Sequence, residues 1–226
     1  MVMVKLKKSE RGMTLFAVLA IMAVFAVALL AVAPTIQQEV QREKELEAIR
    51  RGEEVAEAIR QYVTYYGGAK LPSSMDDLLD GIPYGTKKRQ ILRASAAIDP
   101  LSEDGRWRLI KADIDGIGNF ARRVQNYNGG QLPANPGQVF DRYAVVIVNS
   151  LNTETESDIE GADDDFEVVT ENTPFIGVAS QYRGKSVISY YGIENASKWV
   201  FTPLFRGTGR SNFRPGGRPP GNIITR

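Results

Sequence analysis

The sequence predicts an α+β fold, in which a long N-terminal membrane-spanning and stalk helix packs on a small antiparallel β-sheet head. Three observations lead to this prediction. Residues 13–33 hold no charged side chain, and residues 34–66 continue with apolar side chains at helical spacing. The rest of the chain alternates short β-rich runs with glycine breaks, a pattern typical of short antiparallel strands.

The composition argues against an enzyme. The chain has no cysteine and no histidine, which removes disulfides, thiolate nucleophiles and imidazole acid–base catalysis. An enzyme would then need paired carboxylates, a lysine or a bound metal, and no motif brings such groups together. The formal net charge of +1 gives no global field that would attract nucleic acid, so no nucleic-acid partner is expected.

The first element is the uncharged run over residues 13–33. A hydrocarbon core of ~30 Å needs about 20 apolar helical residues, so this run is long enough to span a bilayer. Four basic residues precede it, against one acidic residue, Glu10. This basic flank predicts a single-pass protein with a cytoplasmic N-terminus and its head on the other side of the membrane. The four residues are Lys5, Lys7, Lys8 and Arg11.

Three kinds of exported protein fit this run. A secretory signal peptide would be removed after Ala33, but Pro34 fits a peptidase site badly and the run exceeds the usual apolar core of a signal peptide. A plain signal anchor would stay unprocessed. A leader that is cut before the run, on the cytoplasmic side, explains more of the residues around Gly12.

Residues 10–15, Glu-Arg-Gly-Met-Thr-Leu, resemble the leader of type IV pilins and type II secretion pseudopilins. The resemblance implies that residues 1–12 are a leader peptide, which a prepilin peptidase removes by cutting after Gly12. Met13 would then be the new N-terminus, whose amine is methylated. Pro34 stands where members of this family carry a helix-kinking proline, and a proline there cannot donate to the carbonyl four residues earlier.

One position departs from the family pattern. Members usually have a glutamate at the fifth position of the mature chain, where this chain has Ala17. In the family, that glutamate is thought to pair with the N-terminal amine of a neighbouring subunit inside the membrane, where an unpaired charge is costly. Ala17 leaves the anchor intact but removes this assembly contact. The sequence therefore does not decide whether the chain is a major or a minor subunit.

Residues 34–68 predict an amphipathic stalk helix. Its apolar stripe favours packing on the head or on neighbouring stalks over a solvated linker, and Gly67 and Gly68 are expected to end it. Glu47 and Arg51, four residues apart, are expected to support the helix weakly. The stripe consists of Ile36, Val40, Leu46, Ile49, Val55, Ile59, Val63 and Tyr66.

The head is predicted over residues 69–205. It should begin with a short capped helix over residues 72–79, ended by Gly81. Trp107 and Trp199 are expected in the core or at a sheet edge rather than as ligand platforms. Four β-rich runs are similar to segments of major-pseudopilin heads and suit one small antiparallel sheet on the stalk. They are residues 105–110, 174–180, 186–191 and 199–201.

Two regions do not fit a compact head of this family. Residues 113–173 are predicted as an insertion, which would contain an extra strand over residues 143–148 and an acidic stretch over residues 154–167. Residues 206–226 are rich in glycine, proline and arginine, have little to bury, and are predicted to be a disordered tail.

The acidic stretch raises the question of calcium. This ion takes six to eight oxygen ligands, and clustered carboxylates can supply several of them. Asp163, Asp164 and Asp165 are therefore calcium candidates, although their spacing lacks the alternate-residue pattern of a known calcium loop. The competing interpretation is a solvated loop. No other cofactor and no catalytic residue is predicted.

The resemblance implies a structural role. The chain would be a subunit of a type II secretion pseudopilus or a related type IV filament, in the bacterial inner membrane with its head periplasmic or extracellular. Its partners would be other pilin-like subunits, the prepilin peptidase and the inner membrane itself. The alternative is a single-pass, membrane-anchored periplasmic binding module that does not polymerise.

Overall fold

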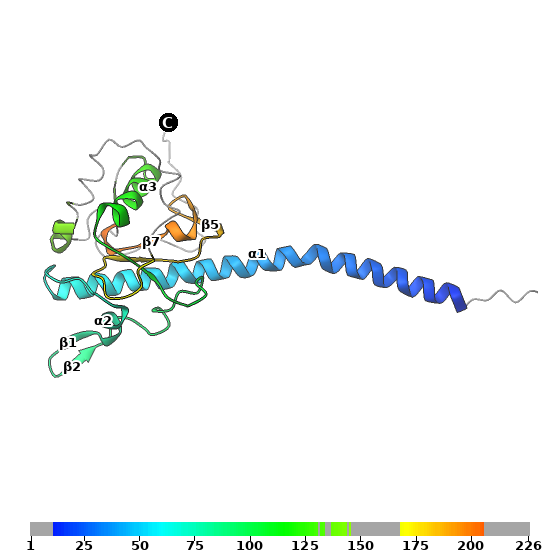
Figure 1. Cartoon of the computed structure of the whole chain (residues 1–226), viewed down its shortest axis with the longest axis horizontal. Coiled ribbons are helices and arrows are strands. Elements are labelled where there is room, and N and C mark those ends of the chain that lie inside the picture. The colour runs from blue at the N-terminus through cyan, green and yellow to red at the C-terminus, as the bar shows by residue number, and fades with distance from the viewer. Residues whose placement is uncertain (1–10, 131, 134–136, 144, 146–167, 206–226) are drawn as a thin grey trace, which may run out of the picture. The chain divides into compact units, whose positions relative to one another are not determined.

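The computed structural model describes residues 11–130, 132–133, 137–143, 145 and 168–205, without the side chains of residues 11–12, 29–35 and 114–115. The chain divides into two compact units, Met1–Gln41 and Arg42–Arg226. Helix α1 (Arg11–Tyr65) supplies the described residues of the first unit and the first element of the second (Figure 1).

The other described elements all belong to the second unit. The α-helices are α2 (Met75–Asp80) and α3 (Asn119–Tyr127). The strands are β1 (Ile82–Tyr84), β2 (Lys87–Arg89), β3 (Arg108–Ile110), β4 (Gly177–Ala179), β5 (Lys185–Tyr190), β6 (Ile193–Asn195) and β7 (Val200–Phe201). The short helical turns are η1 (Ile114–Gly118), η2 (Gln138–Phe140), η3 (Ala196–Lys198) and η4 (Pro203–Phe205).

The predicted α+β class with small antiparallel pairing is confirmed. Within the described ranges the strands form three sheets, in the orders β1–β2, β3–β4–β7 and β5–β6. In the β3–β4–β7 sheet, Val178 pairs with Leu109 on one side and with Phe201 on the other. The expectation of one sheet is corrected, because Tyr191 and Gly192 both have positive φ and turn β5 back onto β6 instead.

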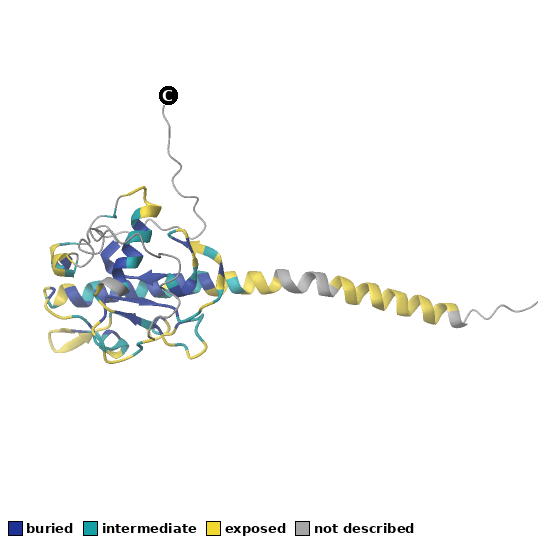
Figure 2. Ribbon diagram, turned by 45° about the horizontal axis from the view of Figure 1, so that its top comes forward, coloured by how far each residue is buried: buried dark blue, intermediate teal, exposed yellow. Residues whose placement is uncertain are grey.

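The core forms along the second half of α1. Four members of the predicted apolar stripe are buried there: Ile49, Val55, Ile59 and Val63. Figure 2 shows this change along the helix, from exposed side chains to buried ones. The stripe is thus confirmed from Ile49 onward, and corrected at its start, since Ile36 and Val40 are exposed.

Gly52 allows a close approach between α1 and strand β7 of the β3–β4–β7 sheet. The ring of Phe201 occupies the space that a Cβ atom on Gly52 would need. A glycine inside a helix lowers helix stability, so its presence here is explained by the packing of β7 and not by helix propensity. Figure 1 shows β7 between α1 and α3.

The helix ends follow the predicted local signals. After Tyr65, Gly67 N–H donates to the Thr64 carbonyl at 3.1 Å and Gly68 N–H donates to the Val63 carbonyl at 2.9 Å. Both glycines have positive φ, which is the usual way of closing a helix. Helix α2 begins with a capping box between Ser74 and Asp77. The short capped helix predicted for this part of the chain is therefore confirmed.

Helix α3 covers the other side of the aromatic core. The ring centroid of Phe120 lies 5.6 Å from that of Phe205. The Phe120 ring also stacks on the Tyr190 ring, with their centroids 6.4 Å apart. This helix falls inside residues 113–173, the predicted insertion, so part of that region contributes to the core. Trp107 and Trp199 are buried, as expected, and their indole N–H groups donate to the carbonyls of Ala96 and Ile193.

The extra strand predicted over residues 143–148 is wrong at its described positions. Tyr143 and Val145 are helical, whereas residues 144 and 146–148 lie outside the described part of the chain. The hydroxyl of Tyr143 donates to the Gly68 carbonyl at 3.0 Å, which holds this turn against the end of α1. A tertiary contact thus overrides the β propensity of this run.

Candidate functional site: the apolar and anchoring faces of helix α1

The first face covers residues 13–28 of α1, and all of its side chains are exposed. The side chain of Met13 is 79% exposed and that of Phe16 is 76% exposed. Thr14 is the single polar residue among residues 13–28. This part of α1 is therefore apolar on all sides and lacks the polar face that a helix on a protein surface turns toward water. The large members are Met13, Leu15, Phe16, Val18, Leu19, Ile21, Met22, Val24, Phe25 and Val27.

An apolar surface of this kind marks contact with a membrane or with other chains. Among the residues searched, which are the described ones alone, no helix combines the length and apolarity that crossing a bilayer requires. The side chains of residues 29–33, the last part of the predicted span, lie outside that set.

The predicted processing residues lie at the start of the apolar face. Helix α1 begins at Arg11, which places Gly12 and Met13 in its first turn. Ala17 is exposed one turn further on. The leader residues 1–10 lie outside the described part of the chain.

The other predicted site residues are not tested by the structure. Helix α1 is assigned without a break past Pro34, whose side chain is not described, so the kink stays a prediction. The calcium candidates Asp163, Asp164 and Asp165 fall outside the described residues. Within the described ranges, no group of three acidic side chains is placed to hold a metal ion.

The second face of α1 contains a buried carboxylate that the sequence pattern did not reveal. Glu45 is completely buried, and its oxygens accept hydrogen bonds from the backbone N–H groups of Val187 and Ile188, at 2.9–3.0 Å. The pairing of β5 with β6 is irregular between Lys185 and Tyr190. Glu45 therefore supplies acceptors to strand donors, and it joins α1 to the β5–β6 hairpin.

One signal could have identified Glu45. It lies three residues before Ala48 and four before Ile49, both buried, and so on the apolar side of the helix. A charged residue on that side must find a partner or cost stability. In the sequence Glu45 stands between stripe positions, among other charged residues such as Glu43 and Glu47.

A network of charges flanks Glu45 on α1. Glu47 accepts hydrogen bonds from Arg50 at 2.7 and 2.8 Å and from Arg51 at 2.7 Å, so the predicted Glu47–Arg51 pair is present. Arg51 also donates to the Ile98 carbonyl at 3.1 Å, which ties the helix to the loop before β3. The hydrogen bond from Arg50 is the main cause that lowers the pKa of Glu47, to about 2.

A second buried carboxylate, Asp99, ties the same loop to β4. Its Oδ1 accepts from the Leu101 N–H at 3.0 Å and its Oδ2 accepts from the Ser180 hydroxyl at 2.7 Å. Burial raises the pKa of Asp99, and these hydrogen bonds oppose that rise. Like Glu45, it is engaged in holding backbone and neighbouring side chains, which is a structural task.

A groove of about 480 Å³ lies between α2 and the residues just before β3. Its apolar lining includes Met75, Leu79 and Trp107. At its rim, Arg106 and Glu171 form an exposed ion pair at 2.8 Å. The groove is thus lined by both apolar and charged side chains.

The chain was compared with protein-family models, curated proteins and solved structures. No protein-family model, no curated protein and no solved structure matches the chain.

Proposed function

We propose that the chain is a structural, pilin-like subunit, anchored in a bacterial inner membrane by residues 13–33. It would serve a type II secretion pseudopilus or a related type IV filament, as a major or a minor subunit. The observation that carries this proposal is the described part of the anchor, residues 13–28, where the helix exposes apolar side chains on every side. Such a surface is stable only against lipid or against other apolar helices.

Two sequence features support the proposal. The basic residues before Met13 orient the anchor so that the second unit is exported. The motif around Gly12 resembles a prepilin leader, which would expose the Met13 amine to methylation after cleavage. Filament assembly would then proceed by packing of the apolar segments of neighbouring subunits, with no reaction in the head.

The fold of the second unit suits this role. Its core is built on the same helix that carries the apolar face, and Glu45 and Arg51 bind backbone groups of segments far away in sequence. Forces on α1 would therefore reach the β5–β6 hairpin through the buried Glu45 carboxylate. A membrane-anchored binding module that does not polymerise is the second candidate, and Ala17 favours it, because the usual assembly glutamate is absent there.

A fusion experiment tests the anchor and its direction. A reporter enzyme that is active only in the periplasm is fused after Arg226 of the full chain and expressed in a bacterium. We expect an active reporter in the membrane fraction. A matched variant, Leu19→Arg with Phe25→Arg, places two charges in the apolar face, which are costly inside a bilayer, and should leave the reporter inactive. An inactive reporter on the unchanged chain would contradict the proposal.

A further inference from the structure

The hairpin of β1 and β2, residues 82–89, exposes a face that combines an aromatic ring with two cations. Cross-strand pairing sets Tyr84 opposite Lys87 and Ile82 opposite Arg89, so these four side chains share one face of the ribbon. Ile82, at the start of the hairpin, is buried, whereas Tyr84 is 74% exposed and Lys87 and Arg89 are exposed too. We call Tyr84, Lys87 and Arg89 the basic face.

The cations of the basic face lack partners within the described residues. Lys88, on the opposite face of the hairpin, forms an ion pair with Asp80 at 2.8 Å. Lys87 and Arg89 have no ion pair or hydrogen bond of this kind among the side chains that the structure describes. Two neighbouring cations beside an exposed ring suit an acidic polypeptide, which offers carboxylates to the cations and apolar groups to the ring.

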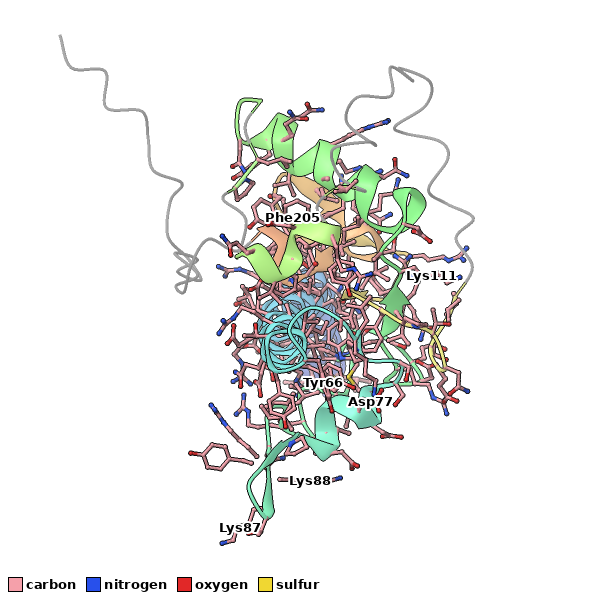
Figure 3. All side chains as sticks on the ribbon, turned by 90° about the vertical axis from the view of Figure 1, so that its left-hand side faces the viewer. Tyr66, Asp77, Lys87, Lys88, Lys111 and Phe205 are labelled. Carbon is pink, nitrogen blue, oxygen red and sulfur yellow. The ribbon has the colours of Figure 1, made fainter. Side chains whose placement is uncertain are left out.

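The base of the hairpin is held firmly. Ile82, the first residue of the hairpin, and Leu92, shortly after its end, are both buried. Gly81 joins α2 to β1 with φ 77°, and a Cβ atom there would overlap the Arg89 carbonyl. Figure 3 shows Lys87 and Lys88 on the hairpin beyond α2, with Lys111 on a different part of the unit. These contacts hold the backbone from which the basic face projects, so binding need not order that backbone.

The chain itself contains a complementary partner. Residues 154–167 hold eight acidic side chains and no basic one, and no lysine or arginine occurs between Arg142 and Arg183. The whole chain has a net charge of +1, so the rest of it carries +1 − (−8) = +9. One chain thus carries both halves of a charge-complementary contact.

We propose that the basic face binds the acidic segment, residues 154–167, of a neighbouring copy of this chain. The inference rests on the proposed function, because subunits side by side in a membrane or filament bring copies together. It would supply a contact between heads where Ala17 removes the usual contact between anchors. Because face and segment are different surfaces, the contact runs from one copy to the next and need not close into a dimer.

Such a contact is weak between free molecules and sensitive to salt. Exposed charges are screened over about 8 Å at physiological ionic strength. Confinement of the copies to one membrane raises their effective concentration, which favours a contact that would not hold in dilute solution. The experiment therefore uses the full chain in its membrane.

Disulfide cross-linking tests the contact directly, because the chain has no cysteine of its own. Thr86→Cys, in the hairpin turn, is placed in one tagged copy, and Ala162→Cys is placed in a second copy with another tag. Neither change removes a charge. We expect oxidation to join the two tagged copies at least fivefold more than a control pair, in which Lys111→Cys replaces Thr86→Cys.

Charge reversal shows whether the cross-link reports this contact. Lys87→Glu with Arg89→Glu in the first copy should reduce cross-linking to the level of the control. Reversal of all eight acidic side chains of residues 154–167 to lysine in the second copy should then restore it. Raising the salt from 0.1 to 0.5 M should lower the cross-linking of the unchanged pair severalfold.

Three results would overturn the inference. The first is cross-linking at or below the level of the Lys111→Cys control. The second is cross-linking that survives the reversal of Lys87 and Arg89. The third is a disulfide that forms within a single copy carrying both Thr86→Cys and Ala162→Cys, with no joined copies. Membrane anchoring in the same cells is measured separately, so an anchored chain without the cross-link would overturn this inference and leave the proposed function standing.

Discussion

Glu45 shows how one residue fixes the relation between helix and strand in the second unit. Its carboxylate lies fully buried on α1 and accepts the N–H groups of Val187 and Ile188 on β5. Removing this acceptor leaves two strand N–H groups without their hydrogen-bond partner, which costs more than the net strength of a hydrogen bond wherever water cannot replace it. The contact therefore has a measurable effect on stability.

We predict that Glu45→Ala lowers the free energy of unfolding by about 1–3 kcal/mol, because two backbone donors lose a charged acceptor. Glu45→Gln keeps one acceptor oxygen and should cost less. The measurement is denaturant unfolding of the full chain in detergent. Glu43→Ala, on an exposed neighbour, is the matched control and should change stability by less than about 0.5 kcal/mol. Equal effects of the Glu45 and Glu43 substitutions to alanine would contradict the assignment.

At the scale of elements, α1 and the β3–β4–β7 sheet approach closely at Gly52. Glycine to alanine usually stabilises a helix by about 1 kcal/mol, but here the new methyl group meets the Phe201 ring. We predict a net loss of about 1–3 kcal/mol for Gly52→Ala, the usual range for overpacking. The same substitution in a Phe201→Leu background should cost less, and unfolding of the four chains measures that coupling. A stabilising Gly52→Ala would show that the packing is looser than described.

The Glu47 network predicts a dependence of stability on pH. The pKa of Glu47 in the folded chain is about 2, below its ordinary value of 4.5. Its contribution is therefore complete above pH 4.5 and is lost as the pH falls toward 2. The site is partly solvated, so the contribution is only about 1 kcal/mol after screening. Unfolding curves of the natural chain and Glu47→Gln should converge over this pH range, and a constant difference would contradict the prediction.

Local signals in the sequence predict the ends of elements well. Gly67, Gly68 and Ser74 act through their own backbone and nearest neighbours, so their roles could be inferred without the fold. The hairpin from β5 to β6 could not, because it depends on a turn at Tyr191, a residue type that rarely adopts positive φ. Helix α3 was missed because its apolar residues are few and matter only where the aromatic core meets them.

The candidate site likewise has one part that the sequence predicts and one part that it does not. The apolar face of residues 13–28 is visible in the sequence, since it depends only on composition over a continuous run. Glu45 depends on donors that lie about 140 positions later in the chain, at Val187 and Ile188. A tertiary contact of that range leaves no local signal, apart from a charge on the apolar side of a helix.

For the whole molecule, the central claim is an anchored, exported subunit with a prepilin-like leader. The residues that decide it, Gly12 and Met13, stand at the start of the apolar face. Pro34, at the other end of the predicted span, disfavours removal of the span by a signal peptidase. The two modes of processing, and the absence of processing, would give chains that start at different residues.

Mass analysis of the N-terminus, on protein from native membranes with an active prepilin peptidase, tests this claim most directly. The account predicts a chain that begins at Met13 and carries a methylated amine. Gly12→Asp is the matched control, because it changes the residue before the cut and leaves the apolar face intact, and it should preserve the leader. An intact Met1 on the unchanged chain would indicate a plain anchor, and a chain that begins at Pro34 would contradict the membrane-subunit account altogether.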